Sequence, residues 1–142
     1  MTDFPNASDK TFEYALTIRE GHLDTYGHVN NAVYVQIFEE ARWELITQNG
    51  YGIDRVASSR LGPVILAMDI KFRREVHNRE RVVVRTRVTG YPDKIGWMEQ
   101  VIHNEKGEPA CVAKFTFGLF DLDKRVLVAP TPEWNRAIGL EK

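Results

Sequence analysis

The stretch NAVYVQIFEEARWELITQ, residues 31–48, is the strongest clue to the fold, because it predicts one long helix. Its apolar residues recur at a spacing of four, three and four positions, which places them on one helical face. This stripe consists of Tyr34, Phe38, Ala41 and Leu45, flanked by Ile37 and Trp43. The early alternation of Val33, Val35 and Ile37 is a competing strand signal, but the helical stripe continues for two more turns.

The ends of this segment carry residues that begin and end helices. Asn30 or Asn31 is a suitable N-cap, because an asparagine side chain accepts a hydrogen bond from a free N–H of the first turn. Gly50 and Gly52 follow the stripe, and glycine commonly ends a helix. We therefore expect the helix to run from Asn31 to Gln48.

The segments on both sides of the helix alternate between apolar and polar residues, as strands do. Alternation covers residues 11–19 and returns after Pro63, in segments near 68–73, 81–88, 97–103 and 111–119. A turn at 104–107, a short strand at 125–128 and a terminal helix after Pro132 complete the pattern. Short turns join antiparallel neighbours. The sequence therefore predicts an α+β protein, in which a curved antiparallel sheet of five or six strands wraps one long helix.

Length and composition set further bounds. A chain of 142 residues with 43% hydrophobic and 27% charged residues fits one domain, residues 1–142, in which we expect residues 1–9 to form a loose tail. The net charge of −1 provides no general attraction to nucleic acid or to a membrane surface. The first ten residues lack the basic and apolar regions of a signal peptide, and the single cysteine, Cys111, fits a reducing compartment. We expect a cytoplasmic protein.

The candidate site is the loop GHLDTYGHVNN, residues 21–31, which leads into the helix. Asp24 supplies a carboxylate, Gly27 permits a sharp turn, and the helix start offers free N–H groups. This combination suits acyl transfer: N–H groups near Asn30 and Asn31 would hold the oxyanion, while Asp24 attacks the carbonyl carbon or activates a water. A thiolate leaves readily, so one carboxylate is sufficient for a thioester.

Other interpretations of the same residues remain open. An aspartate in a glycine-containing loop before a helix commonly forms an Asx-turn or a cap. The spacing of His22, Asp24 and His28 is also compatible with a metal site, although no supporting third ligand is evident elsewhere. There is no Gly-x-Ser-x-Gly, no phosphate-binding glycine loop, and Cys111 lies within a strand pattern. We expect neither a metal nor a cofactor.

Residues 18–42, which contain Asp24, then Gly-His-Val-Asn-Asn at 27–31, Tyr34 and Phe-Glu-Glu-Ala-Arg at 38–42, resemble the active-site segment of a known family. The family is the hotdog-fold acyl-CoA thioesterases of the 4-hydroxybenzoyl-CoA thioesterase type, and the long-chain acyl-CoA branch is the most similar. The resemblance implies a homodimer or homotetramer with the acyl site between subunits. It also implies catalysis by Asp24, carbonyl polarisation near Asn31, and substrate positioning by Gly27, His28, Asn30 and Tyr34.

Two departures from the family pattern are present. His22 replaces the first carboxylate of a common Asp-x-Asp pair, and residues 73–80, RREVHNRE, replace an Arg-Pro and Gly-Asp turn. This altered turn contains Arg73, Arg74 and Arg79, which we predict to bind the phosphates of CoA. The expected substrate is an acyl-CoA or an acyl group on acyl carrier protein. The alternatives are a non-catalytic acyl-thioester-binding hotdog module and a hotdog hydratase or dehydratase, which uses a His–acid pair in a different segment.

Overall fold

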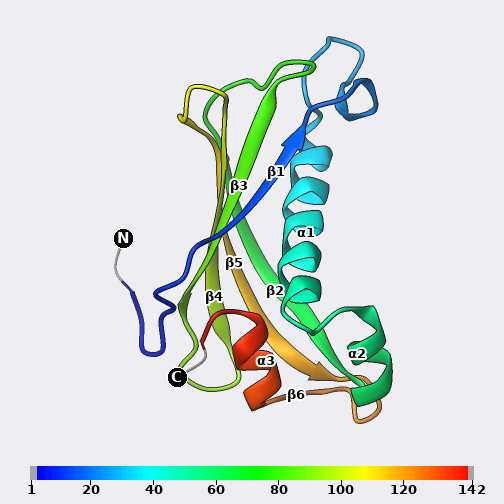
Figure 1. The fold of residues 1–142 in the computed structure, drawn as a ribbon, viewed down its shortest axis with the longest axis vertical. Coiled ribbons are helices and arrows are strands. Elements are labelled where there is room, and N and C mark those ends of the chain that lie inside the picture. Colours follow the sequence, from blue (N-terminus) through cyan, green and yellow to red (C-terminus); the bar gives the residue numbers. More distant parts are fainter. Residues whose placement is uncertain (1–2, 141–142) are drawn as a thin grey trace.

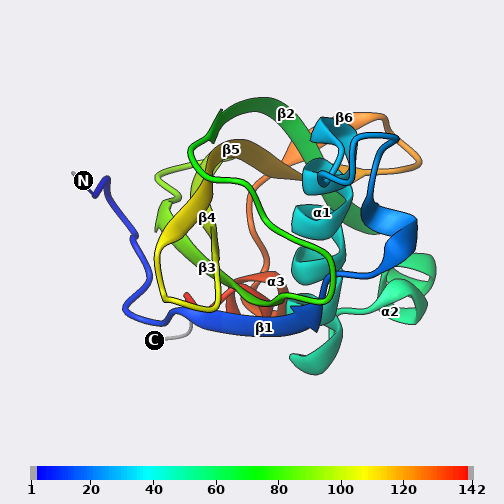
Figure 2. The same ribbon diagram turned by 90° about the horizontal axis from the view of Figure 1, so that it is seen from above.

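A computed structural model of the protein describes residues 3–140. One antiparallel sheet curves around the long helix α1 (Asn31–Gln48), as Figures 1 and 2 show. The strands are β1 (Phe12–Thr17), β2 (Leu61–Phe72), β3 (Arg81–Gly90), β4 (Gly96–His103), β5 (Pro109–Asp121) and β6 (Val126–Val128). The main strand order is β1-β3-β4-β5-β2, and β6 pairs with β5. The predicted sheet wrapped on one helix is confirmed.

The long helix has the predicted bounds. Asn30 is the N-cap, and its side chain accepts a hydrogen bond from the N–H of Ala32 at 2.9 Å. At the other end Asn49 is the C-cap and Gly50 follows with a φ of +85°, which glycine adopts without steric cost. The stripe predicted from the sequence is buried against the sheet, and its members are Tyr34, Phe38, Ala41 and Leu45.

Short helices lie near the ends of the sheet. The 3-10 helix η1 (Glu20–His22) follows β1, α2 (Ile53–Ser59) follows α1, and α3 (Pro132–Ala137) comes last. The sequence predicts α3 but not α2, because seven residues are too few to show a helical period. Gly52 is the N-cap of α2 and does not end α1. No helix within residues 3–140 combines the length and apolar character that a membrane crossing requires.

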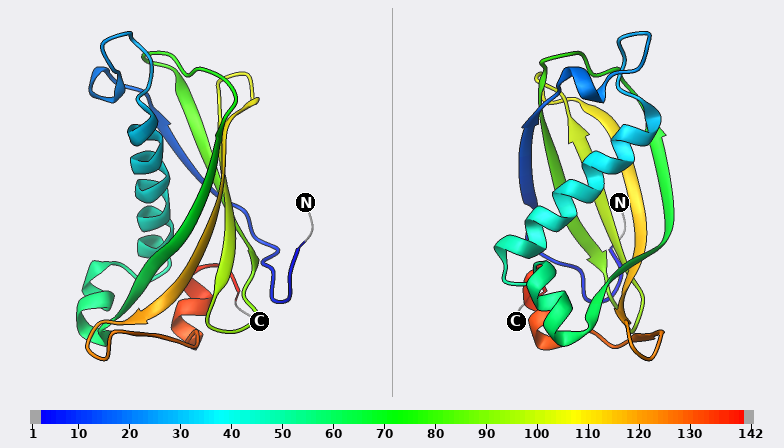
Figure 3. Two further views of the ribbon diagram at one scale, coloured as in Figure 1. Left: turned by 180° about the vertical axis from the view of Figure 1, so that it is seen from behind. Right: turned by 90° about the vertical axis from the view of Figure 1, so that its right-hand side faces the viewer.

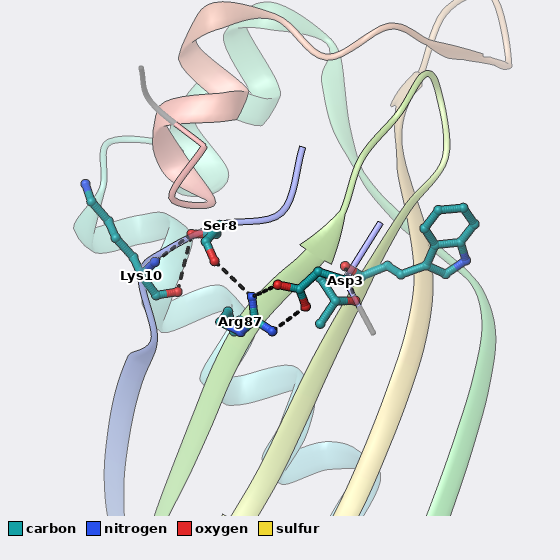
Figure 4. Close-up of polar contacts among 6 residues, drawn as sticks. Asp3, Ser8, Lys10 and Arg87 are labelled. Carbon is teal, nitrogen blue, oxygen red and sulfur yellow. Dashed lines mark hydrogen bonds and ion pairs between the residues drawn. The ribbon is translucent and has the colours of Figure 1, made fainter. Parts of the chain in front are cut away.

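The N-terminal segment differs from the loose tail predicted for residues 1–9. Residues 1 and 2 lie outside the described range, but Phe4 and Ser8 donate backbone hydrogen bonds of 2.8 and 2.9 Å to carbonyls of β3. β1 pairs with β3 only as far as Thr86, so the rest of that edge is free to hold this segment. An ion pair between Asp3 and Arg87 also ties the segment to β3 (Figure 4). The prediction is therefore wrong for residues 3–9.

The register places the alternating residues of β2 and β5 on the same concave face. Met68, Ile70 and Phe72 of β2 lie opposite Phe115, Ala113 and Cys111 of β5. The residues of β5 are buried, whereas Met68 and Phe72 are each 50% exposed. β2 lies at an edge of the sheet, whereas α1 packs on β5 through the ring contact of Phe38 with Phe115. The alternation in β2 was predicted correctly, but its burial is incomplete.

Candidate active site

The loop between β1 and α1 is held in a fixed shape by Asp24. Its Oδ1 accepts hydrogen bonds from the N–H groups of Tyr26 at 2.9 Å and His28 at 3.2 Å. Its own N–H donates to the carbonyl oxygen of His28 at 2.8 Å. Gly27 turns the chain with a φ of +81°. The Asx-turn that the sequence allowed is therefore formed, and it uses one oxygen of the carboxylate.

The other oxygen of Asp24 is not used in this turn. Oδ2 accepts no hydrogen bond from any residue between 3 and 140. The side chain is partly buried, and so it is both positioned and accessible. A structural role for Oδ1 and a chemical role for Oδ2 are compatible within the same residue.

The start of α1 leaves one N–H group available. The N–H of Asn30 donates to the carbonyl oxygen of His22 at 3.3 Å, and that of Ala32 is capped by the Asn30 side chain. The N–H of Val33 donates to the carbonyl oxygen of Asn30 at 2.9 Å. Within the described residues, the N–H of Asn31 has no acceptor. Of the two N–H groups proposed from the sequence, the one at Asn31 remains free, at the positive end of the helix dipole.

These groups face a shared hollow of about 310 Å³. The residues that line it come from the loop, from α1 and from the end of β2 with the turn that follows it. They are Asp24, His28, Val29, Asn31, Tyr34, Phe72, Arg73, Arg74, Glu75 and Val76. Six predicted site residues are thus brought together. Gly27 and Asn30 shape the loop and cap the helix, and they do not line the hollow.

Tyr34 forms part of the inner wall of the hollow. Its side chain is 6% exposed, and its ring lies 5.4 Å from the ring of Phe72 between centroids. Burial is the main reason that the pKa of Tyr34 rises to about 12. The phenol therefore stays protonated even at moderately alkaline pH.

The three arginines predicted to bind CoA phosphates differ in their surroundings. The N–H groups of Arg73 and Arg74 both donate to the carbonyl oxygen of Ala110, at 2.8 and 3.0 Å, which fixes the chain at the hollow. The Arg74 side chain pairs with Glu108 at 3.4 Å, whereas Arg73 has no carboxylate partner in the described part of the chain. Arg73 is therefore the cation best placed to meet an anionic ligand.

Arg79 lies away from the hollow. Its guanidinium forms an ion pair with Glu20, and Nε donates to the carboxylate at 2.8 Å. This pair connects the turn after β2 to the 3-10 helix η1, and Arg79 itself has a φ of +65°. The structure therefore places Arg79 as a loop-to-loop connection, apart from Arg73 and Arg74.

The alternative chemistries find little support in the geometry. The Nδ1 atom of His22 accepts a hydrogen bond from the N–H of Arg19 at 2.8 Å, and His28 lies 3.5 Å from Glu75. Within residues 3–140, no three His, Cys, Asp or Glu side chains gather as metal ligands would. Cys111 is fully buried, and burial raises the pKa of its thiol to about 12, which disfavours the nucleophilic thiolate.

Four residues of the hollow were not among the predicted site residues: Val29, Phe72, Glu75 and Val76. Phe72 was recognised only as a strand residue, because alternation does not reveal what lies beyond the edge of a sheet. One feature of the sequence could have identified Phe72: the alternation ends there, which marks the end of the strand, and this end lies beside the start of α1.

Comparisons with known proteins agree with this geometry. The model of the thioesterase-like superfamily matches residues 18–138. The long-chain acyl-CoA thioesterase FadM of Escherichia coli (strain K12) is 30% identical over 115 residues, which are 80% of this chain and 86% of that protein. The crystal structure of YbaW, a probable thioesterase from Escherichia coli, is 26% identical with a TM-score of 0.78 and covers 90% of this chain and 96% of its own. A Staphylococcus aureus protein in complex with CoA shares the fold at 15% identity and a TM-score of 0.84, over 97% of this chain and 84% of its own.

The chain belongs to the thioesterase-like superfamily. The resemblance noted in the sequence, the hotdog fold and the assignment as a thioester hydrolase are confirmed.

Proposed function

We propose that this protein hydrolyses acyl-CoA thioesters in the hollow at the start of α1. One observation carries the proposal: Asp24, which has a carboxylate oxygen free of hydrogen bonds, and Asn31, which has a free N–H, are both lining residues of the same hollow among the described residues. Thioester hydrolysis uses one group that activates or supplies the nucleophile and one that holds the oxyanion, and a carboxylate and a backbone N–H are suited to these two roles. The name of FadM, a long-chain acyl-CoA thioesterase, supports the same substrate class.

The reaction follows from these positions. The thioester carbonyl oxygen lies against the N–H of Asn31 and gains negative charge as the carbon is attacked. As a base, Asp24 takes a proton from water through Oδ2, the hydroxyl oxygen bonds to the carbon, and the C–S bond breaks to release the CoA thiolate. As a nucleophile, Oδ2 bonds to the carbonyl carbon and the C–S bond breaks to release the CoA thiolate, which leaves an anhydride that water then cleaves. After a single turnover in ¹⁸O-labelled water, label in Asp24 would identify the anhydride route, because it enters the side chain only when water attacks the Asp24 carbonyl carbon of the anhydride.

The substitution Asp24→Asn tests the carboxylate. Asparagine retains a side-chain oxygen to accept from Tyr26 and His28, but it cannot act as a base or nucleophile. We expect kcat to fall at least about 100-fold, roughly 2.7 kcal/mol of barrier, with little change in Tm. Asp24→Ala removes the turn as well and should lower both kcat and Tm. An Asn variant that retains more than about a tenth of kcat would remove Asp24 from the mechanism.

The substitution Asn31→Pro tests the N–H group. Asn31 is the first helical residue, where proline is tolerated, and Asn30 already has the extended backbone that precedes a proline, with φ −66° and ψ 143°. Losing one oxyanion donor typically costs about 100-fold to 1,000-fold in kcat. We expect a loss of this size with the helix content intact. Asn31→Ala, which retains the N–H, is the matched control and should remain nearly as active as the wild type. Equal activity of the two variants would contradict the assignment.

Arg73 and Arg74 are proposed to meet the phosphates of CoA, and Arg79 is omitted because it is paired with Glu20. Arg73→Ala should raise KM several-fold, Arg74→Ala should raise it less because Glu108 already neutralises that cation, and added salt should raise KM further. Arg79→Ala is the control and should leave KM unchanged. Assays with one acyl group on CoA and on acyl carrier protein would decide between the two carriers.

The proposal includes a homodimer or homotetramer in the cytoplasm. β2 presents an edge of twelve residues, and Leu66, Met68 and Phe72 on it are 46–50% exposed. Such a long apolar edge is normally covered, and a second copy that extends the sheet would cover it. The single unpaired cysteine fits a reducing compartment.

A further inference from the structure

An apolar cavity lies far from the hollow, beside the second half of α1. It measures about 320 Å³ and is enclosed by α1, the first part of β2, the sheet and α3. Its lining residues are Glu39, Arg42, Trp43, Leu45, Ile46, Pro63, Val64, Ile65, Met98, Phe117, Trp134 and Ile138. Ten of these twelve side chains are uncharged and mainly hydrocarbon in character. A cavity of this size and lining is suited to an apolar ligand.

One of the two charged lining residues, Arg42, already has its partners within the protein. Arg42 is held against the sheet: its Nη1 donates to Oε1 of Gln100 at 2.9 Å, and its guanidinium carbon lies 4.5 Å from the ring centre of Phe115. Burial lowers the pKa of Arg42 to about 10, so the group is still charged near neutral pH. The guanidinium is thus held by the protein itself and does not require an anionic ligand.

A row of apolar side chains connects the hollow to this cavity. The concave face of β2 carries Phe72, Ile70, Met68, Ile65 and Pro63 in succession, since their partners on β5 are all core residues. Phe72 lines the hollow, and Ile65 and Pro63 line the cavity. Both β2 and α1 contribute residues to the hollow and to the cavity, and Figure 3 shows the two elements inclined to each other. The row therefore provides an apolar surface from the proposed thioester site to the cavity.

The length of this row sets the size of the ligand. From Tyr34 to Arg42 the helix advances about 12 Å at roughly 1.5 Å per residue. From Phe72 to Ile65 the strand advances about 23 Å at roughly 3.3 Å per residue. An extended alkyl chain advances about 1.3 Å per carbon, because its C–C bonds of about 1.5 Å zigzag at tetrahedral angles. A chain that reaches the cavity therefore needs about 10 to 18 carbons.

We infer that this cavity receives the distal end of a long, unbranched acyl chain, and that α3 closes the cavity and limits the chain length. The inference rests on the proposed function, since it assumes that the thioester lies at Asp24. Trp134 and Ile138, both 2% exposed, form the wall that α3 contributes. Thr131 caps α3 by accepting from the N–H of Trp134 at 3.2 Å, which holds this wall in place.

The first experiment measures hydrolysis of acyl-CoAs from C4 to C18 by the wild type and three variants. Ile65→Trp fills the cavity from β2, and Val126→Trp adds the same side chain at an exposed position of β6. We expect Ile65→Trp to raise KM for C14 and C16 at least tenfold while C4 stays within twofold, and Val126→Trp to match the wild type. Ile138→Ala should move the optimum to longer chains.

The second experiment detects the chain end without hydrolysis. Two of the three tryptophans, Trp43 and Trp134, line the cavity, whereas Trp97 packs on Phe4 elsewhere. In the wild type, 12-bromododecanoic acid should quench tryptophan fluorescence more strongly than 2-bromododecanoic acid. Equal quenching, with the same chain-length profile for Ile65→Trp and wild type, would overturn the cavity assignment and leave the activity intact. Position-dependent quenching without hydrolysis of any acyl-CoA would overturn the proposed activity and retain the cavity assignment.

Discussion

β5 and β2 are neighbouring strands with the same alternation of apolar and polar residues, but their concave faces differ in exposure to solvent. On β5 the concave face from Cys111 to Leu119 is at most 1% exposed, because β5 has strands on both sides and α1 above it. On β2 the equivalent residues Met68 and Phe72 are half exposed, because β2 is at the edge. Alternation thus reports that a residue points toward the concave face, and position in the sheet decides whether that face is covered. The strand that is less covered is also the one that lines the hollow and the cavity.

The substitution Phe115→Ala on β5 should have the largest effect on stability. The Phe115 ring packs against Phe38 at 5.7 Å and under the guanidinium of Arg42, and removing it leaves a void in the core. We expect the free energy of unfolding to fall by about 3–5 kcal/mol, measured by urea denaturation at fixed protein concentration. Thr116→Ala, on the other face of β5, is the control and should cost under about 1 kcal/mol. Equal losses would show that the two faces of β5 are not distinct.

On β2, Met68→Lys should affect assembly more than folding. If a second copy extends the sheet at the edge of β2, a lysine at position 68 places an unpaired charge beside that interface. We expect self-association to weaken at least about tenfold, or roughly 1.4 kcal/mol, with an unchanged circular dichroism spectrum. Sedimentation over a dilution series measures the effect. A wild-type protein that is an active monomer at all concentrations would contradict the proposed dimer.

A residue on the convex face of the sheet should have a smaller effect on stability than the residues of β5 and β2. Nδ1 of His103 is buried and has no hydrogen-bond partner among the described residues, and burial is the main reason that the pKa of His103 is lowered from 6.5. A lowered pKa means that the neutral form is favoured in the fold. The contribution of neutral His103 to the free energy of unfolding is therefore complete above about pH 6.5, and it is lost as the pH falls through the lowered pKa of His103.

We expect His103→Gln to lose less stability than the wild type between pH 7.5 and 5.5, by a small margin because the site is partly solvated. Urea titrations of both proteins across this range measure the difference. Parallel losses in the two proteins would indicate that His103 titrates normally and that the convex face is open to water.

Much of the fold follows from local sequence signals. The bounds of α1, a helix of 18 residues, were predictable because the apolar stripe, an asparagine cap and a glycine stop agree. The turn at residues 104–107 was predictable because Asn104 and Gly107 suit it, and they are joined by a hydrogen bond of 2.9 Å. By contrast, α2 is too short to show a period, and β2 begins at Leu61, before Pro63, because an edge strand tolerates proline.

The candidate site was predictable in part for the same reason. Asp24, Asn31 and Tyr34 lie within one continuous segment, so a local motif contained them. The ordering of residues 3–9 along β3 and the separation of Arg79 from Arg73 depend on contacts between distant segments, which spacing along the chain does not reveal. Arg79 lies six residues from Arg73 in the sequence, yet its partner Glu20 belongs to the loop after β1.

The pairing of the strands also affects how the chain reaches this structure. β3, β4 and β5 are joined by short connections, and the Asn104–Gly107 turn brings β4 and β5 together locally. β1 and β2 pair with strands far along the chain, so that Phe12 lies opposite Thr86 and Leu61 opposite Asp121. Closing such long loops costs entropy before the pairing contributes. We expect β3, β4 and β5 to form the folding nucleus. In that case substitutions in β4 would slow folding, while substitutions in the edge strand β2 would mainly accelerate unfolding.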